Sequence, residues 1–285
     1  MRPIRTLFER PAAGTEPVLP EDLRALYGGD LQFPVDGGGR PYIVGNFVST
    51  LDGVVSYEIP GKAGGGDISG FDEGDRFIMG LLRASADAVL IGAGTLHEVL
   101  RGHVWAAEFV NRAASESYAH YREEILHKSR FPLNVVVSGS GRVDLERNIF
   151  RRSDVRTIIV TTPDGRDRLM SAGVQSLPAT EVRAIQPQGS LLAAADIVDL
   201  LWRDFDVRLL LHEGGPILFG TFIAQKLVDE FFLTIAPQLA GRSVVKPRPG
   251  MVSGVEFSPD TAPWLDILSA KQNGDHLYLR YQRRA

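Results

Sequence analysis

Short, unbroken apolar runs recur along this chain, and most are followed by a turn and by a segment with helical spacing. A strand buried on both faces has this continuous apolar character, whereas a half-exposed strand alternates. The pattern predicts an α/β fold in which a mainly parallel central sheet carries helices on both faces. The predicted strands are residues 41–49, 86–92, 133–138, 155–162, 182–185, 209–211 and 229–236, with two strand-like segments at 265–270 and 276–281.

The apolar run at 209–211 leads into Glu213, Gly214, Gly215 and Pro216, which predicts a strand, a tight turn and a helix N-terminus. Proline is well tolerated at a first helical position, and glycine permits positive φ and the close approach of a ligand. The free N–H groups and the dipole of such a helix end favour a phosphate. Taken alone, the same residues also fit an ordinary strand-to-helix turn.

Glycine and hydroxyl residues end three more of the predicted strands. In an open α/β sheet the ligand binds beyond the carboxyl ends of the strands, so these turns are expected to converge on one crevice. Two glycine turns onto helices, with hydroxyl groups between them, suit an extended phosphorylated ligand such as a dinucleotide. The residues concerned are Gly92, Gly94, Thr95, Ser138, Arg142, Thr161 and Thr162, together with residues 213–216.

The chain has 285 residues, enough for one large α/β domain or two small ones. Its formal net charge of −4 argues against a surface that binds nucleic acid or an acidic membrane. No stretch approaches the roughly 18 consecutive apolar residues of a spanning helix. The first residues lack the apolar core of a signal peptide, so a cytoplasmic location is expected.

Cysteine is absent, which excludes disulfides, thiol nucleophiles, thiolate zinc sites and Fe–S clusters. It also excludes a nucleobase deaminase of the zinc-dependent type, whose metal ligands include cysteine. The six histidines are scattered without metal-ligand spacing. No metal is therefore predicted.

Three other segments carry expectations of their own. Residues 1–40 are predicted to form an N-terminal arm with one short helix at 20–27, ahead of the main domain at 41–285. The glycine-rich loop at 61–70 is either a mobile lid over a pocket or a floppy insertion. In the helix predicted at 191–205, one apolar stripe comprises Leu191, Ala195, Val198 and Trp202.

In combination and in order, several motifs resemble the reductase domain of riboflavin biosynthesis, the RibD C-terminal type, over about residues 41–280. The form resembled is the stand-alone pyrimidine reductase, which lacks the cysteine-dependent deaminase half. The motifs are Ser49-Thr50-Leu51-Asp52-Gly53; Asp75-Arg76; Leu82-Arg83-Ala84-Ser85-Ala86-Asp87-Ala88-Val89-Leu90-Ile91-Gly92-Ala93-Gly94-Thr95; Glu213-Gly214-Gly215-Pro216; and Leu227-Val228-Asp229-Glu230 with Leu233-Thr234-Ile235-Ala236-Pro237.

The resemblance implies a dihydrofolate-reductase-like fold with antiparallel C-terminal strands, NADPH as hydride donor and, usually, a homodimer. It implies cofactor contacts from two sides of the crevice, with hydroxyl groups near the adenosine and Arg142 near a 2′-phosphate. The implied cofactor-binding residues are Gly92, Gly94 and Thr95 on one side, Glu213, Gly214, Gly215 and Pro216 around the pyrophosphate, Ser138, Thr161 and Arg142 near the adenosine, and Asn46 and Ser49 at the nicotinamide.

A carboxylate beside a pyrophosphate is repelled. Glu213 is therefore expected to point away from the pyrophosphate and to bond a ribose hydroxyl or a backbone N–H group.

The implied substrate is a ribosylaminopyrimidine phosphate, like 5-amino-6-(5-phosphoribosylamino)uracil, whose sugar is opened at C1′ and reduced. Asp52, on the turn after the first strand, is the first candidate for a carboxylate that assists protonation. Asp75, at the start of the next helix, is the second. Each residue also fits an ordinary role as a turn or cap residue.

Two elements of the family pattern differ in this chain. Val54 stands where family members usually have a basic residue after Asp-Gly, and residues 96–103 replace an Asp-x-Pro-x-Leu stretch. Those elements help to hold the substrate's phosphate and pyrimidine, so two other functions stay open. One is an NADPH-dependent reductase of dihydrofolate or a dihydropterin, and the other is a nucleotide-binding protein without turnover.

Overall fold

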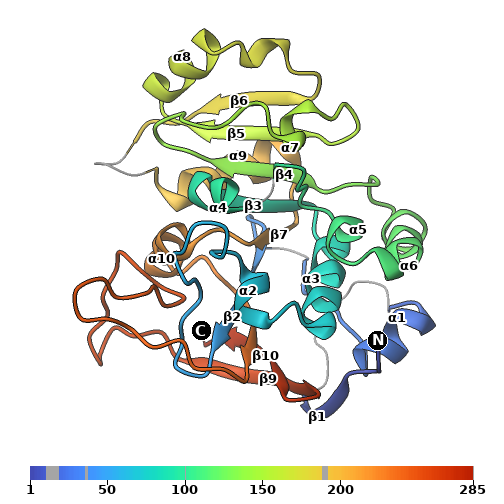
Figure 1. Ribbon diagram of the computed structural model, residues 1–285. Helices are drawn as coiled ribbons and strands as arrows, with labels where there is room; N and C mark the ends of the chain where they lie inside the picture. The colour runs from blue at the N-terminus through green and yellow to red at the C-terminus, as the bar shows by residue number, and fades with distance from the viewer. Residues whose placement is uncertain (11–18, 36–37, 100, 188–191, 285) are drawn as a thin grey trace.

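The computed structural model describes residues 1–10, 19–35, 38–99, 101–187 and 192–284, which form one sheet of ten strands with helices around it (Figure 1). The strand order is β1-β9-β10-β8-β2-β7-β3-β4-β5-β6. The strands are β1 Arg5–Glu9, β2 Tyr42–Thr50, β3 Ala88–Gly92, β4 Leu133–Val137, β5 Thr157–Thr161, β6 Thr180–Ala184, β7 Leu209–His212, β8 Glu230–Ala236, β9 Leu265–Asn273 and β10 His276–Arg283.

The helices connect and cover these strands. The α-helices are α1 Glu21–Tyr27, α2 Gly65–Ser69, α3 Glu73–Ser85, α4 Ala93–Glu98, α5 Ala107–Val110, α6 Ser115–His120, α7 Asn148–Arg151, α8 Pro163–Ser171, α9 Ala194–Phe205 and α10 Pro216–Ala224. Short 3₁₀ turns η1 Arg112–Ala114 and η3 Val174–Ser176 and the π-helical turn η2 Tyr121–Ile125 accompany them. Among the described residues, none of the helices combines the length and apolar character that crossing a bilayer requires.

The sheet has a parallel part and an antiparallel part. Strands β8, β2, β7, β3, β4, β5 and β6 are parallel to their neighbours within this run. Strands β10, β9 and β1 extend it with antiparallel pairs beyond β8. This arrangement confirms the predicted fold class, a dihydrofolate-reductase-like α/β fold with a mainly parallel sheet and antiparallel C-terminal strands.

The central parallel strands β3, β4, β5 and β7 are buried on both faces, which explains their continuous apolar sequences. Along β3, Val89 and Ile91 belong to one core cluster, whereas Ala88 and Leu90 belong to another. The first cluster includes buried residues of α3 and α6, and the second includes residues of α9 and α10. Alternate side chains of a strand therefore pack against helices on opposite sides of the sheet.

Helix α9 buries a different stripe from the predicted one. Its buried residues are Ala194, Ile197, Val198 and Leu201. Ala195 is exposed, Trp202 is half-buried, and Leu191 lies outside the described residues. Of the predicted stripe, Val198 is buried as expected. Trp202 lies at the rim of the buried face instead, and the Arg208 guanidinium carbon is 3.8 Å from the centroid of its ring.

Within residues 1–10, 19–35 and 38–40, the part of this segment that the structure describes, the chain forms a strand and a helix. Strand β1 pairs with β9, and the predicted short helix is present as α1. Leu23 and Phe33 are buried in the same core cluster as α3. The segment was expected to form an arm. In the described part, its apolar side chains instead pack in the common core.

The glycine-rich loop expected at 61–70 contains the short helix α2. Ile68 of this helix is fully buried in a small cluster with Val48, Val54 and Ala236. This part of the loop therefore packs against the ends of β2 and β8.

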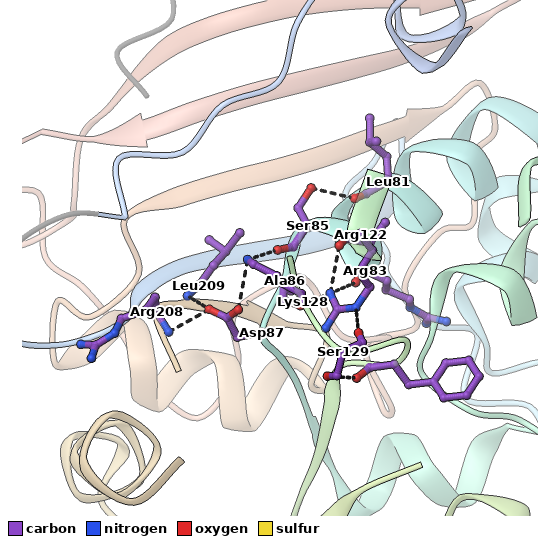
Figure 2. Close-up of polar contacts among 12 residues, drawn as sticks. Leu81, Arg83, Ser85, Ala86, Asp87, Arg122, Lys128, Ser129, Arg208 and Leu209 are labelled. Carbon is purple, nitrogen blue, oxygen red and sulfur yellow. Dashed lines mark hydrogen bonds and ion pairs between the residues drawn. The ribbon is translucent and has the colours of Figure 1, made fainter. Parts of the chain in front are cut away.

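The C-terminal end of α3 is fixed by a network of polar groups at the amino edge of the sheet (Figure 2). The buried Arg122 guanidinium donates to the carbonyl oxygens of Ala84 (2.9 Å) and Ala86 and to that of Ser129 (2.6 Å). Nearby, Lys128 forms an ion pair with Asp87 (3.0 Å). These bonds satisfy the carbonyl groups at the C-terminal end of α3. The N-terminal end of the same helix contains Asp75, a residue of the site described next.

Candidate active site

The carboxyl ends of β5, β4, β3, β7 and β2 lie along one edge of the sheet, because these strands are parallel. The turns that follow β5 and β4 contact each other, since the Thr161 hydroxyl donates to the Ser138 carbonyl oxygen at 2.6 Å. The turn after β4 in turn contacts α4, where a ring nitrogen of His97 lies 3.4 Å from the Arg142 carbonyl oxygen. The structure therefore brings the predicted turns at 138–142 and 161–162 together.

The two glycine turns after β3 and β7 are also adjacent. Helix α4 begins just after Gly92, so Gly94 and Thr95 lie in its first turn. A Cβ atom on Gly215 would lie 3.3 Å from Oγ1 of Thr95, whereas a Cβ atom on Gly94 would meet no atom within 4 Å. The first turns of α4 and α10 therefore share one surface, and Gly94 leaves space beside it.

The N-termini of α4 and α10 have no side-chain cap, unlike that of α8. Their N-caps are Gly92 and Gly215, which have no side chain to accept the first amide N–H groups. At α8, by contrast, the Thr162 hydroxyl accepts the Gly165 N–H (3.1 Å). The uncapped amides next to β3 and β7 remain able to bond an anionic ligand.

The glycines of the turn at 213–216 allow close packing rather than a left-handed backbone. Neither Gly214 nor Gly215 has positive φ, so that part of the expectation was wrong. A Cβ atom on Gly214 would lie 2.8 Å from the ring of His212, whose Nδ1 accepts the Gly214 N–H at 3.2 Å. Complete burial lowers the pKa of His212 to about 3, so its ring is neutral at physiological pH.

Within the described part of the chain, the Glu213 carboxylate pairs with an arginine side chain and not with the expected backbone N–H group. Its carboxylate accepts hydrogen bonds from the Arg83 guanidinium, from Nε to both oxygens (3.2 and 3.1 Å) and from Nη2 to Oε2 (2.7 Å). Both side chains are buried, with 3% and 8% of their surfaces exposed. The Arg83 charge compensates that of Glu213, which allows a carboxylate to remain beside an anion-binding turn.

Arg83 also approaches His103, whose Nε2 atom lies 3.5 Å from Nη1. Burial, and then the Arg83 charge, lowers the pKa of His103 to about 3. Arg83 lies within a motif quoted from the sequence but was assigned no role there. The neighbouring sequence gives one sign that Arg83 has a role, namely a charged residue among buried positions of α3. Its partner Glu213 is 130 residues away along the chain, so the pairing itself leaves no local pattern.

Asp75 is a buried carboxylate in the first turn of α3. It does not cap the helix, since Asp72 accepts the Asp75 N–H at 2.8 Å. Its Oδ2 atom has no hydrogen-bond partner within the described part of the chain. Burial raises the pKa of Asp75 to about 6, although bonds from the Thr234 and Ser69 hydroxyls oppose this shift. Such a group can hold or release a proton near neutral pH.

Asp52 has the opposite environment. Its carboxylate accepts the Thr50 hydroxyl (2.5 Å) and the N–H groups of Ala240 (3.1 Å) and Gly241 (2.7 Å). These bonds, that from Thr50 first, lower the pKa of Asp52 to about 2. Asp52 is therefore ionised at physiological pH, and it anchors the segment after β8 to the turn after β2.

The remaining predicted residues lie along the same edge with different degrees of access. Thr161 is fully buried, so its hydroxyl shapes the Ser138 turn from beneath. Ser49 is also buried, and the side chain of Arg142 is exposed. Asn46, on β2, approaches Glu213 with its Nδ2 atom 3.5 Å from the carboxylate.

Comparisons with known proteins agree with this architecture. The family model described as the RibD C-terminal domain matches residues 41–266. The chain is 30% identical, over 71% of its length and 83% of the relative's, to the 2,5-diamino-6-ribosylamino-4(3H)-pyrimidinone 5′-phosphate reductase of Archaeoglobus fulgidus.

Two solved structures share the fold. A pyrimidine reductase-like protein from Corynebacterium diphtheriae is 19% identical, with a TM-score of 0.67 and coverage of 92% of this chain and 98% of that one. RibD of Acinetobacter baumannii is 20% identical, with a TM-score of 0.63 and coverage of 87% of this chain. The chain spans only 59% of that longer protein.

Proposed function

The chain belongs to the RibD C-terminal domain family, and we propose that it uses NADPH to reduce a ribosylaminopyrimidine 5′-phosphate in riboflavin biosynthesis. Such a reductase opens the ribosyl ring at C1′ and yields a ribityl chain. The observation that carries the proposal is the pair of adjacent, uncapped helix N-termini after β3 and β7. These helix ends suit the pyrophosphate of a dinucleotide. A relative of the chain is named as a reductase, which is a class of enzyme that uses such a cofactor.

The residues of the carboxyl edge fit NADPH. The amides after Gly92 and Gly215 would bond the pyrophosphate, and the space at Gly94 would let it approach the backbone. The Ser138 turn would receive the adenosine, with the exposed Arg142 side chain near its 2′-phosphate. When bound, the cofactor supplies the hydride, while the protein orients it and handles protons.

Asn46 and Ser49 on β2 would lie next to the nicotinamide. Glu213, paired with Arg83, would hold the turn between the pyrophosphate and this end of the site. Gly214 and Pro216 would shape that turn. Thr161 would support the Ser138 turn without touching the cofactor.

Of the two candidate carboxylates, we assign proton exchange with the substrate to Asp75. Its raised pKa and its unpaired Oδ2 atom support a group that exchanges a proton with the substrate. The lowered pKa of Asp52, together with its bonds to Ala240 and Gly241, supports a positioning role instead. This reverses the order in which the sequence ranked them.

The test is NADPH oxidation measured side by side with the phosphoribosylamino-pyrimidine and with dihydrofolate. We expect turnover of the pyrimidine and none of dihydrofolate. Turnover of dihydrofolate alone would assign a different substrate class, and tight NADPH binding without any oxidation would indicate a non-catalytic nucleotide-binding protein. Absence of NADPH binding would contradict every enzymatic version of the proposal.

We also propose a homodimer. Among the described residues, strand β1 is at the end of the sheet and pairs with β9 alone, and its Leu7 and Phe8 side chains are exposed. An exposed apolar edge strand favours association with another copy. Light scattering is expected to give the mass of a dimer for the wild type and that of a monomer for Phe8→Lys. A monomeric wild type would contradict this.

A further inference from the structure

His212, the last residue of β7, lies in the middle of the sheet beneath the glycine turn. It is in register with Gly45 of β2 on one side and with Leu90 of β3 on the other. Its side chain is fully buried. The imidazole ring packs against α10, with its centroid 5.0 Å from that of Phe219 and 4.7 Å from that of Phe222. A polar side chain therefore occupies an apolar position.

The two ring nitrogens of His212 have different environments. Nδ1 accepts the Gly214 N–H at 3.2 Å, whereas Nε2 has no hydrogen-bond partner in the described part of the chain. A neutral imidazole that accepts at Nδ1 carries its proton on Nε2. A buried N–H without an acceptor costs stability. An apolar side chain would avoid that cost, but it would leave the Gly214 N–H without its acceptor.

The first two amides of the turn are both bonded within the protein. The Glu213 N–H donates to the Leu90 carbonyl oxygen at 2.9 Å, and the Gly214 N–H donates to His212. Gly215, which follows, is the N-cap of α10 and has no side chain to accept the amides after it. His212 therefore takes up the last amide before the one at which an anion site can begin.

The bond to His212 also fixes the orientation of the turn. Because a peptide unit is planar, holding the Gly214 N–H against the ring directs the Glu213 carbonyl oxygen to the opposite side. Only glycine fits at position 214, since a Cβ atom there would lie 2.8 Å from Cε1 of His212. On the helix side, the Phe219 N–H donates to the Gly215 carbonyl oxygen at 3.0 Å, and the Phe219 ring packs on His212. His212 thus contacts both the turn and the helix that follows it.

We propose that His212 is a positioning residue for the cofactor. It holds the Gly214 amide beneath the turn and so presents the Gly215 amide and the start of α10 to the pyrophosphate of NADPH. The proposal rests on the proposed function and goes beyond it, because His212 acts through the turn without touching the ligand. If its acceptor is removed, the peptide between Glu213 and Gly214 must be ordered when NADPH binds, which lowers affinity.

The test is a matched pair of variants, His212→Asn and His212→Leu. Both remove the ring and leave side chains of similar size and shape. Only asparagine has an oxygen that can accept the N–H of the residue two positions on. We expect His212→Leu to raise the Kd for NADPH about tenfold and His212→Asn to stay within about threefold of the wild type. Equal affinities of the two variants would overturn the proposal, because both lose the same packing.

Steady-state kinetics separates positioning from chemistry. In His212→Leu, KM for NADPH should rise about tenfold, while kcat at saturating NADPH and KM for the pyrimidine should stay within about twofold of the wild type. Phe222→Leu alters the packing on the same ring and is the control. It should lower the Tm without changing KM for NADPH. A lower kcat in His212→Leu with an unchanged KM for NADPH would overturn the proposal.

NMR of the wild-type protein keeps the proposal testable if the variants do not fold. The His212 ring should be the tautomer protonated at Nε2. The Gly214 amide should resist hydrogen exchange with and without NADPH, and the Gly215 amide should become protected only when NADPH binds. A ring protonated at Nδ1, or a Gly214 amide that exchanges freely, would overturn the proposal. The expected tautomer and Gly214 protection without any NADPH binding would instead reject the proposed function.

Discussion

The two edges of the parallel sheet use similar polar groups for opposite purposes. At the amino edge, Arg122, Lys128 and Asp87 bond the end of α3 and the starts of β3 and β7 (Figure 2). At the carboxyl edge, no side chain of the described residues caps the first amides of α4 and α10 or bonds Oδ2 of Asp75. The polar bonds at the amino edge contribute stability, and under the proposed function the free amides at the carboxyl edge bond a ligand.

This difference arises from where the chain places large polar side chains. Arginine and lysine reach the amino edge from η2 and from the segment after it, so carbonyl groups find donors within the protein. The carboxyl edge instead has glycine at the corresponding helix starts. Under the proposed function, the missing caps cost helix stability and permit anion binding.

The largest effect is expected at the amino edge from Arg122→Met. The carbonyl oxygens of Ala84 and Ala86 would lose their buried donor, so the free energy of unfolding should fall by about 3–5 kcal/mol. Urea denaturation measures this change. Arg166→Met, at an exposed arginine of α8, is the control. NADPH affinity of the folded variant should equal that of the wild type, and a loss of affinity would show that the two edges are coupled.

At the carboxyl edge, Gly215→Asp should reduce NADPH affinity about 100-fold, because the new carboxylate would take the helix amides and repel a pyrophosphate. Since aspartate is a favourable N-cap, the Tm should not fall. Pro20→Asp places the same residue at the N-cap of α1, away from the site, and should leave affinity unchanged. Wild-type affinity in Gly215→Asp would refute the anion-binding role of this turn.

Asp75→Asn should raise the free energy of unfolding, whereas Asp87→Asn at the amino edge should lower it. The folded-state pKa of about 6 exceeds the unfolded value near 4, so the native state binds the extra proton and loses stability as pH rises from about 4 to 6. The variant should therefore be more stable than the wild type by about 2–3 kcal/mol at pH 8, and equal to it at pH 3.

The same variant should lose at least about 100-fold in kcat, since a neutral amide cannot exchange the proton. Asp87→Asn is the control and should lower stability, because it removes the ion pair with Lys128. Full activity of Asp75→Asn would contradict its assignment, whatever its stability.

The smallest effect is expected from Glu213→Gln. The amide can still bond Arg83 but leaves its buried charge uncompensated, which should cost about 1–3 kcal/mol of stability. NADPH affinity should be unchanged or higher, because the remaining charge next to the turn is positive. Affinity reduced about tenfold would indicate instead that Glu213 bonds the cofactor directly.

The local features of the site were predictable because they depend on short-range rules. The Asp-Gly turn at 52–53, the start of α10 at Pro216 and the glycine at the start of α4 follow from backbone preferences of neighbouring residues. The alternation of apolar strands and helices likewise predicted the sheet, since burial on both faces requires apolar residues at successive positions.

The partners of the charged groups could not be predicted in the same way. The contact of Glu213 with Arg83 joins residues 130 positions apart, and that of Asp52 with Gly241 joins residues 189 apart. No local periodicity relates such pairs. The environments of the two aspartates could therefore not be ranked from the sequence, because burial and donors, which set a pKa, come from distant segments.

The amino-acid sequence by itself determined the α/β class, the turns that bear the glycines and the edge at which they meet. The tertiary structure alone decided which of these groups are compensated, buried or open. Backbone preference and apolar patterning act over a few residues, whereas electrostatic compensation depends on which side chains folding brings within a few ångströms. That is why Asp52 and Asp75, similar in sequence, have pKa values displaced in opposite directions.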